Sequence, residues 1–85
     1  MSNFENSSEG KRLLKAIGLR IQNDLYKQER SVEDLSLDCG VARSTLREII
    51  AGRSNPRLMT LHSVAVSLGY TGVADFLTKV EKRQG

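Results

Sequence analysis

The chain has 85 residues, of which 39% are hydrophobic and 27% charged, and its formal net charge is +3. This length leaves room for one domain, and the composition is that of an ordinary globular protein. No apolar run approaches the roughly 20 residues that cross a bilayer, and residues 1–10 are too polar for a signal or transit peptide. A single cysteine cannot form an internal disulfide, which favours a reducing compartment. We therefore expect a one-domain cytoplasmic protein.

Positive charge is concentrated in two segments of the chain. Residues 11–30 carry six basic and two acidic side chains, and residues 43–57 carry four arginines and one glutamate. Residues 31–42, which lie between them, carry three acidic and no basic side chains. Charge clusters are usually solvated surface, so a structural motif is needed before they indicate a nucleic-acid partner.

The first predicted element is a long helix over residues 9–28. Apolar residues recur here, as elsewhere in the chain, at intervals of three and four, which favours helices over strands. Ser7 or Ser8 is the expected N-cap, and residues 1–8 are expected to form a flexible arm. The apolar stripe that faces the core consists of Leu14, Ile17, Ile21 and Leu25.

A short helix is expected to follow Ser31, whose hydroxyl suits an N-cap. Two acidic residues come directly after it, where the helix dipole favours negative charge. Leu35 would bury this helix against the core, and Gly40 would end it, because glycine adopts the left-handed conformation without strain. Val41 would then hold the turn against the core.

The next helix is expected over residues 43–51, with Gly52 at its end. Leu46 and Ile49 would bury one side of it and leave Arg43, Ser44, Arg47 and Glu48 facing outward. Two helices joined by a short glycine turn cross steeply, so that the second stands forward as a ridge. Such a ridge fits the major groove of B-form DNA, where each base pair presents its own donors and acceptors.

Two further helices are predicted after the turn-forming residues 52–56. One is expected over 60–68, with Thr60 as N-cap and Gly69 as its stop. Its inward residues are Leu61, Val64, Ala65 and Leu68. The other is expected over 73–82, and it offers Phe76, Leu77 and Val80 to the core. The sequence thus predicts an all-α fold of five helices over residues 9–82, with a basic tail at 83–85.

The segment 31–52, taken with the turn 52–56 and the apolar run 61–69, resembles the phage repressor and Cro-type helix-turn-helix family, also called XRE-like. The shared features are an acidic helix with a buried leucine, Gly-Val at the turn, an outward-facing helix, a loop with Asn-Pro, and an apolar helix ending in Leu-Gly. The resemblance covers roughly residues 13–78. It implies a five-helix repressor-like domain that binds double-stranded DNA.

The resemblance also implies roles for individual residues. The residues expected to contact bases are Arg43, Ser44, Arg47 and Glu48, and a phosphate is the alternative partner for Arg47. Those expected to contact phosphates are Thr45, Arg53, Asn55 and Arg57. Arginine can pair with guanine, and a glutamate can accept from the amine of cytosine. Glu48 has an alternative, since it could pair with Ser44 or Arg47 on its own helix.

Three positions depart from the family pattern. Val32 stands where the family commonly has a glutamine that contacts a phosphate, so that contact is expected to be missing. Ala42 stands where a serine or threonine usually caps the reading helix, a loss of about 1 kcal/mol. Ile50 replaces a frequent glutamate, and it would lie either in the core or against a partner chain.

The function expected from these features is that of a sequence-specific transcription regulator, a repressor or controller that acts as a homodimer on a palindromic operator. The candidate dimer contacts are His62, Val66, Val73, Phe76 and Val80. Tyr70, Phe76 and Leu77 are expected to be core residues rather than residues that stack on single-stranded nucleic acid. The alternative function is a protein-binding module, such as an antitoxin that holds a toxin, and a non-specific DNA binder fits the modest net charge less well.

Other chemistry finds little support in the sequence. No catalytic triad, paired carboxylates or glycine-rich phosphate loop stands out, so we expect no enzyme and no cofactor. Cys39 is expected to be a small buried residue, and His62 has no nearby second ligand, so no metal site is expected. The basic residues of the first helix are expected to be solvated. The alternative is that those at the N-terminal end of this helix contact DNA.

Overall fold

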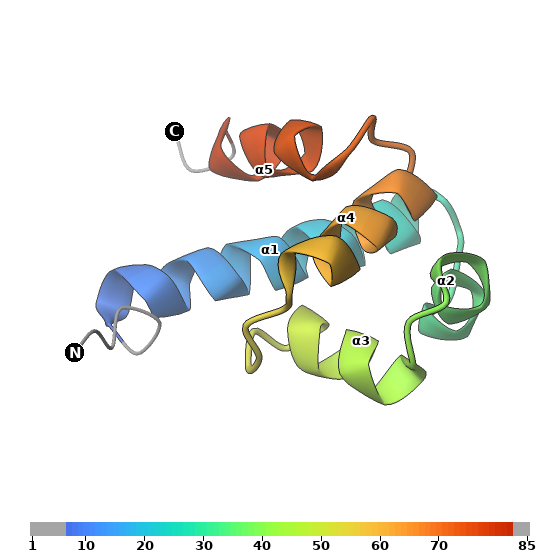
Figure 1. Ribbon diagram of the computed structural model, residues 1–85, viewed down its shortest axis with the longest axis horizontal. Coiled ribbons are helices and arrows are strands. Elements are labelled where there is room, and N and C mark those ends of the chain that lie inside the picture. Colours follow the sequence, from blue (N-terminus) through green and yellow to red (C-terminus); the bar gives the residue numbers. More distant parts are fainter. Residues whose placement is uncertain (1–6, 83–85) are drawn as a thin grey trace.

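The computed structural model describes residues 7–82, and this part of the chain contains five helices and no strand (Figure 1). They are α1 (Ser8–Lys27), α2 (Val32–Cys39), α3 (Arg43–Ile50), α4 (Leu58–Ser67) and α5 (Val73–Lys82). The predicted all-α fold is confirmed. In Figure 1, α1 crosses the molecule with α5 on one side of it and α3 on the other, while α4 packs against both α2 and α5. The remainder of the predicted arm and the tail lie outside the described residues.

α1 begins one residue earlier than predicted. The Ser7 hydroxyl accepts a hydrogen bond from the Gly10 N–H at 3.0 Å, so Ser7 is the N-cap and Ser8 is already helical. These two residues therefore belong to the helix and its cap rather than to an arm. Three residues of the predicted stripe are buried, and Leu14 at its N-terminal end is half-buried.

α1 and α3 approach each other closely at the buried Gly18. A Cβ atom added at this position would lie 2.2 Å from the Ile50 carbonyl oxygen and 2.8 Å from that of Ile49. Any side chain here would force the two helices apart. Gly52 makes a similar approach, because a Cβ there would lie 3.1 Å from the Lys15 Cα atom. The backbone of α1 is thus packed directly on the C-terminal end of α3.

α2 begins with a capping box. The Ser31 hydroxyl accepts from the Asp34 N–H, the Asp34 carboxylate accepts from the Ser31 N–H, and both distances are 3.0 Å. These bonds hold the pKa of Asp34 below its ordinary value. Leu35 is fully buried, as predicted, so the first two turns of α2 are fixed both by the cap and by the core.

α4 begins earlier than the sequence predicted. Its N-cap is Arg57 rather than Thr60, and the Arg57 side chain makes no capping hydrogen bond. The prediction relied on the capping preference of threonine, but the chain already turns into the helix after the loop, where the Arg57 carbonyl accepts from the Leu61 N–H at 2.9 Å. The extra turn carries Leu58 and Met59, which are exposed.

The core is built from apolar residues of all five helices and from Leu68, the residue that follows α4. The buried set consists of Ile17, Ile21, Leu25, Leu35, Leu46, Ile49, Leu61, Val64, Ala65, Leu68, Phe76 and Val80. The four predicted inward residues of the α4 region are all in this set. Two more of the predicted core residues, Tyr70 and Leu77, are half-buried against it.

One charged residue, Asp24, is also buried, with 7% of its surface exposed. The Tyr70 hydroxyl donates to its carboxylate at 2.6 Å and accepts from the Arg20 Nε–H at 2.8 Å. Arg20 also lies 3.7 Å from the Asp24 carboxylate. A buried charge is tolerated only with partners of this kind. The cluster ties α1 to the segment between α4 and α5.

Candidate nucleic-acid interface

The two sides of α3 differ sharply in burial. Leu46 and Ile49 are 0% and 1% exposed, and they hold one side of the helix in the core. The residues that are exposed on the rest of its circumference are Arg43, Ser44, Thr45, Arg47 and Glu48. At 3.6 residues per turn, the four predicted base-contacting residues lie within an arc of roughly 140°. We call these four residues the α3 surface.

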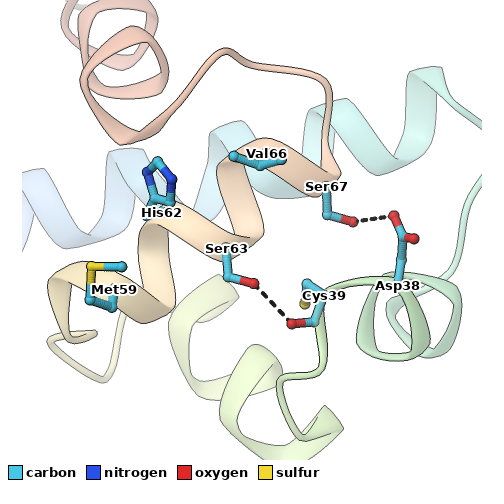
Figure 2. Close-up of a pocket in the computed structure, with 7 residues that line it drawn as sticks. All are labelled: Asp38, Cys39, Met59, His62, Ser63, Val66 and Ser67. Carbon is cyan, nitrogen blue, oxygen red and sulfur yellow. Dashed lines mark hydrogen bonds between the residues drawn. The ribbon is translucent and has the colours of Figure 1, made fainter.

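The turn between α2 and α3 is held by its own geometry and by two serines. Gly40 has φ = +75°, the left-handed conformation that the sequence predicted. The Ser36 hydroxyl donates to the Val41 carbonyl at 2.7 Å. The Ser63 hydroxyl, from α4, donates to the Cys39 carbonyl at 2.9 Å (Figure 2). The turn that leads from α2 into α3 is therefore anchored to α4 at the end of α2.

This geometry, a short helix, a glycine turn and a second helix whose outer side is polar, agrees with the comparison with known families. Residues 25–74, more than half of the chain, match the family described as Helix-turn-helix. This chain belongs to the Cro/C1-type helix-turn-helix family. It is thus a DNA-binding regulator of the XRE type, and α3 is the second helix of its helix-turn-helix. No curated protein and no solved structure matched in the corresponding comparisons.

Two arginines of the helix-turn-helix are already paired with carboxylates. Arg43, at the start of α3, lies 3.3 Å from Glu33 on α2. Arg53 donates to both oxygens of Glu48, at 3.1 and 2.9 Å. This hydrogen-bonded pair lowers the pKa of Glu48 and raises that of Arg53. Neither pair is buried, so each contributes little to stability and is open to exchange with another anion or donor.

Glu48 therefore does not use the partners that the sequence offered on its own helix. Its observed partner, Arg53, lies beyond the end of α3, at a separation that helix spacing rules do not cover. By contrast, Arg47 and Arg57 make no ion pair with any side chain that the structure describes. The arginines of α3 and of the loop after it thus differ in how readily they can engage a phosphate or a base.

The family departures have direct structural counterparts. Ala42 is the N-cap of the reading helix and provides no side-chain hydrogen bond. Ile50 is half-buried and packs against the core, which selects the first of its two predicted placements. Cys39 is half-buried and also packs against the core, rather than being fully buried.

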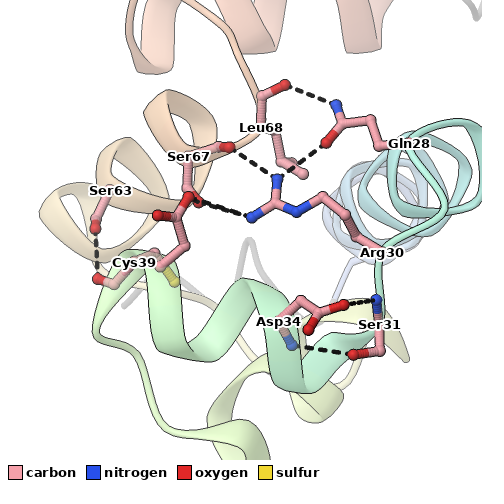
Figure 3. A network of polar contacts seen from close by, with 9 residues as sticks. Gln28, Arg30, Ser31, Asp34, Cys39, Ser63, Ser67 and Leu68 are labelled. Carbon is pink, nitrogen blue, oxygen red and sulfur yellow. Dashed lines mark hydrogen bonds and ion pairs between the residues drawn. The ribbon is translucent and has the colours of Figure 1, made fainter.

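A polar network at the C-terminal ends of α1, α2 and α4 was missed by sequence reasoning (Figure 3). The Arg30 guanidinium donates to the Ser67 carbonyl at 2.9 Å and to the Asp38 carboxylate at 3.2 Å. The Gln28 amide donates to the Leu68 carbonyl at 2.8 Å. These bonds satisfy carbonyls at the C-terminal end of α4, which the helix itself leaves without partners. The network joins the ends of α1, α2 and α4, and no short sequence motif would have identified it.

The five predicted dimer contacts separate into two groups. Phe76 and Val80 are 0% and 1% exposed, so they belong to the core of the single chain and offer no surface to a partner. They were predicted as dimer contacts because members of the family often pair through the last helices, but here α1 and α4 pack against this side of α5. Val73 is half-buried against the core, and His62 accepts from the Val73 N–H at its Nδ1 atom, at 3.2 Å. Val66 remains exposed, at 49%.

Val66 lies on the outer side of α4 together with Met59 and His62 (Figure 2). This side borders a hollow of about 460 Å³ whose opposite wall comes from Asp38 and Cys39 at the end of α2. Met59 is 70% exposed, which is high for so large an apolar side chain.

Among the described residues, no helix has the length and apolar character that crossing a bilayer requires.

Proposed function

We propose that this protein is a cytoplasmic, sequence-specific transcription regulator that binds a palindromic operator as a homodimer and acts there as a repressor or controller. The observation that carries the proposal is the α3 surface. Leu46 and Ile49 hold the inner side of α3 in the core, while the four hydrogen-bonding side chains of the α3 surface share the outer arc. A helix presented in this way fits the major groove and can distinguish base pairs by their edges.

In this proposal Arg47 and Arg43 read bases, Ser44 adds a shorter contact, and Glu48 accepts from cytosine once a phosphate takes over Arg53. Thr45, Arg53, Asn55 and Arg57 hold the sugar-phosphate backbone and set the orientation of the protein. The Glu33 carboxylate limits the motion of the Arg43 side chain before binding, at 3.3 Å. Restricting a side chain in this way reduces the entropy lost on binding.

The homodimer is proposed because one reading helix covers only a few base pairs. Two copies related by a twofold axis place their reading helices about 34–36 Å apart, one turn of DNA, and so recognise two half-sites. The outer side of α4, with Val66 and Met59 exposed, is the surface that we assign to this contact.

Selection of binding sites from random duplex DNA tests the proposal. We expect an enriched palindrome, and we expect Arg43→Ala to lose preference at one position of each half-site, by about 1–3 kcal/mol. Lys79→Ala is the matched control, because Lys79 lies on α5, on the other side of α1 from the reading helix (Figure 1).

The same experiment addresses the second candidate function, a protein-binding module such as an antitoxin. The exposed Leu58, Met59 and Val66 of α4 favour it, since a binding partner could cover them. A selection that returns no enriched sequence, together with co-purification of a neighbouring gene product, would replace the DNA-reading proposal with this one.

A further inference from the structure

Outside the segment that matches the family, the N-terminal half of α1 carries two lysines that face a second hollow of the molecule. This hollow, of about 500 Å³, lies between α1 and the loop that follows the reading helix. Its lining includes Lys11, Leu14, Lys15, Gly52, Arg53 and Asn55. The family match begins at residue 25, so it does not assign any role to Lys11 or Lys15.

The packing of α1 fixes where these lysines stand. The backbone of Lys15 lies directly against Gly52, since a Cβ at Gly52 would be 3.1 Å from the Lys15 Cα atom. Lys11 is one turn earlier on the same side of α1, because residues four apart are neighbours on a helix surface. Arg53, which follows Gly52, contributes the third cation. Residues far apart in sequence therefore form one basic site at the C-terminal end of the reading helix.

The charges of this site are unevenly neutralised. Arg53 is bound to Glu48, whereas Lys11 and Lys15 make no ion pair among the described residues, and both are exposed. Lysine binds phosphate well as a compact charge on a flexible stem. Because the site is continuous with the reading helix through Gly52 and Arg53, a duplex in contact with α3 would bring its backbone to the same place.

We infer that Lys11 and Lys15, together with Arg53, form a second phosphate-contacting site that holds the DNA backbone outside the base pairs read by α3. This inference rests on the proposed function and extends it, since the footprint of each subunit becomes longer than the helix-turn-helix alone provides. Each lysine that neutralises a phosphate releases a counterion, so it steepens the dependence of affinity on salt.

The test uses the full-length protein with Lys11→Ala and Lys15→Ala combined. Affinity is measured over a series of salt concentrations, on a selected duplex and on a duplex of unrelated sequence. We expect the slope of log affinity against log salt to become shallower by about 1 for each lysine, on both duplexes, while the preferred sequence is unchanged. Shortening the flanks of the selected duplex should reduce the slope of the parent protein and not that of the variant.

Lys27→Ala is the matched control. Lys27 is an exposed lysine in the last turn of the same helix, roughly 24 Å along its axis from Lys11. We expect it to leave the slope unchanged, and all variants to keep the circular dichroism and melting temperature of the parent. A double variant whose slope equals that of the parent would overturn the inference. Failure of the proposed function is separate, because it would appear as a lack of sequence preference in the parent protein.

Discussion

At the scale of single residues, the fold depends on a polar contact that Tyr70 makes inside the molecule. Its hydroxyl is hydrogen-bonded to both Asp24 and Arg20, so it helps to stabilise a buried carboxylate. Asp24 could have been recognised in the sequence, because it lies three residues after Ile21 on the apolar stripe of α1. Its partner Tyr70 could not, since Tyr70 is 46 residues away from it in the chain.

We expect Tyr70→Phe to lower the free energy of unfolding at neutral pH by about 1–3 kcal/mol, because Asp24 loses a hydrogen bond while it stays buried. Burial and the Asp24 carboxylate raise the pKa of Tyr70 above its ordinary value of 10.0. A raised pKa in the folded state gives stability that is complete below the unfolded pKa and is lost as pH rises through the folded one. The variant should therefore show a smaller loss of stability at alkaline pH.

Urea unfolding at neutral and alkaline pH measures both effects. Tyr26→Phe is the control, because Tyr26 is the second tyrosine of the chain and is 84% exposed. Equal stability curves for the two variants would show that the Tyr70 hydroxyl does not support the fold.

At the scale of helices, the position of α3 is set by its backbone contact with α1. We expect Gly18→Ala to destabilise the protein by about 1–3 kcal/mol, because the added methyl would lie 2.2 Å from the Ile50 carbonyl oxygen. In an unobstructed helix the same change stabilises by about 0.5–1 kcal/mol, so the sign of the effect identifies the contact. Thermal and urea unfolding give that sign, and a more stable variant would contradict the observed packing.

The helix ends divide according to how local their causes are. Ser31, Gly40 and the glycine after α3 act through their own side chains or backbone, and their roles were predicted correctly. The start of α4 was predicted wrongly. Thr60 has the side chain of a good N-cap, but the helix starts after Arg57, whose side chain makes no capping hydrogen bond. Capping preference is worth only about 1 kcal/mol, so it does not by itself decide where this helix starts.

At the scale of the whole molecule, the outer side of α4, where Met59 and Val66 are exposed, is the surface that we propose for contact with a second copy. We expect Val66→Asp to weaken self-association at least tenfold, because a carboxylate would be buried without a partner in the dimer. Ala74→Asp, at an exposed position of α5, should leave it unchanged. Sedimentation equilibrium of the free proteins gives both dissociation constants. A parent protein that remains monomeric, and binds its palindrome as one copy, would contradict the assignment.

For the candidate site, the sequence predicted which residues of α3 are exposed, and their roles in DNA binding stay predictions. The exposure of Arg43, Arg47 and Glu48 follows from the spacing of Leu46 and Ile49, which any helix of this sequence would share. The Glu33–Arg43 and Glu48–Arg53 pairs do not follow from spacing, because each joins residues on different elements. Loss of Phe76 and Val80 as surface residues has a similar origin, since only the packed helices show which apolar side is covered.

The sequence by itself determined the number of helices, the turn at Gly40, the inward residues of each helix and the family to which the chain belongs. Each of these features depends on residues within a turn or two of one another, so the local sequence is enough to predict it. The tertiary structure decided which charges are paired, that Asp24 is buried, and that Lys15 stands beside Gly52. These depend on distances between segments far apart in the chain, and such distances exist only once the helices have packed.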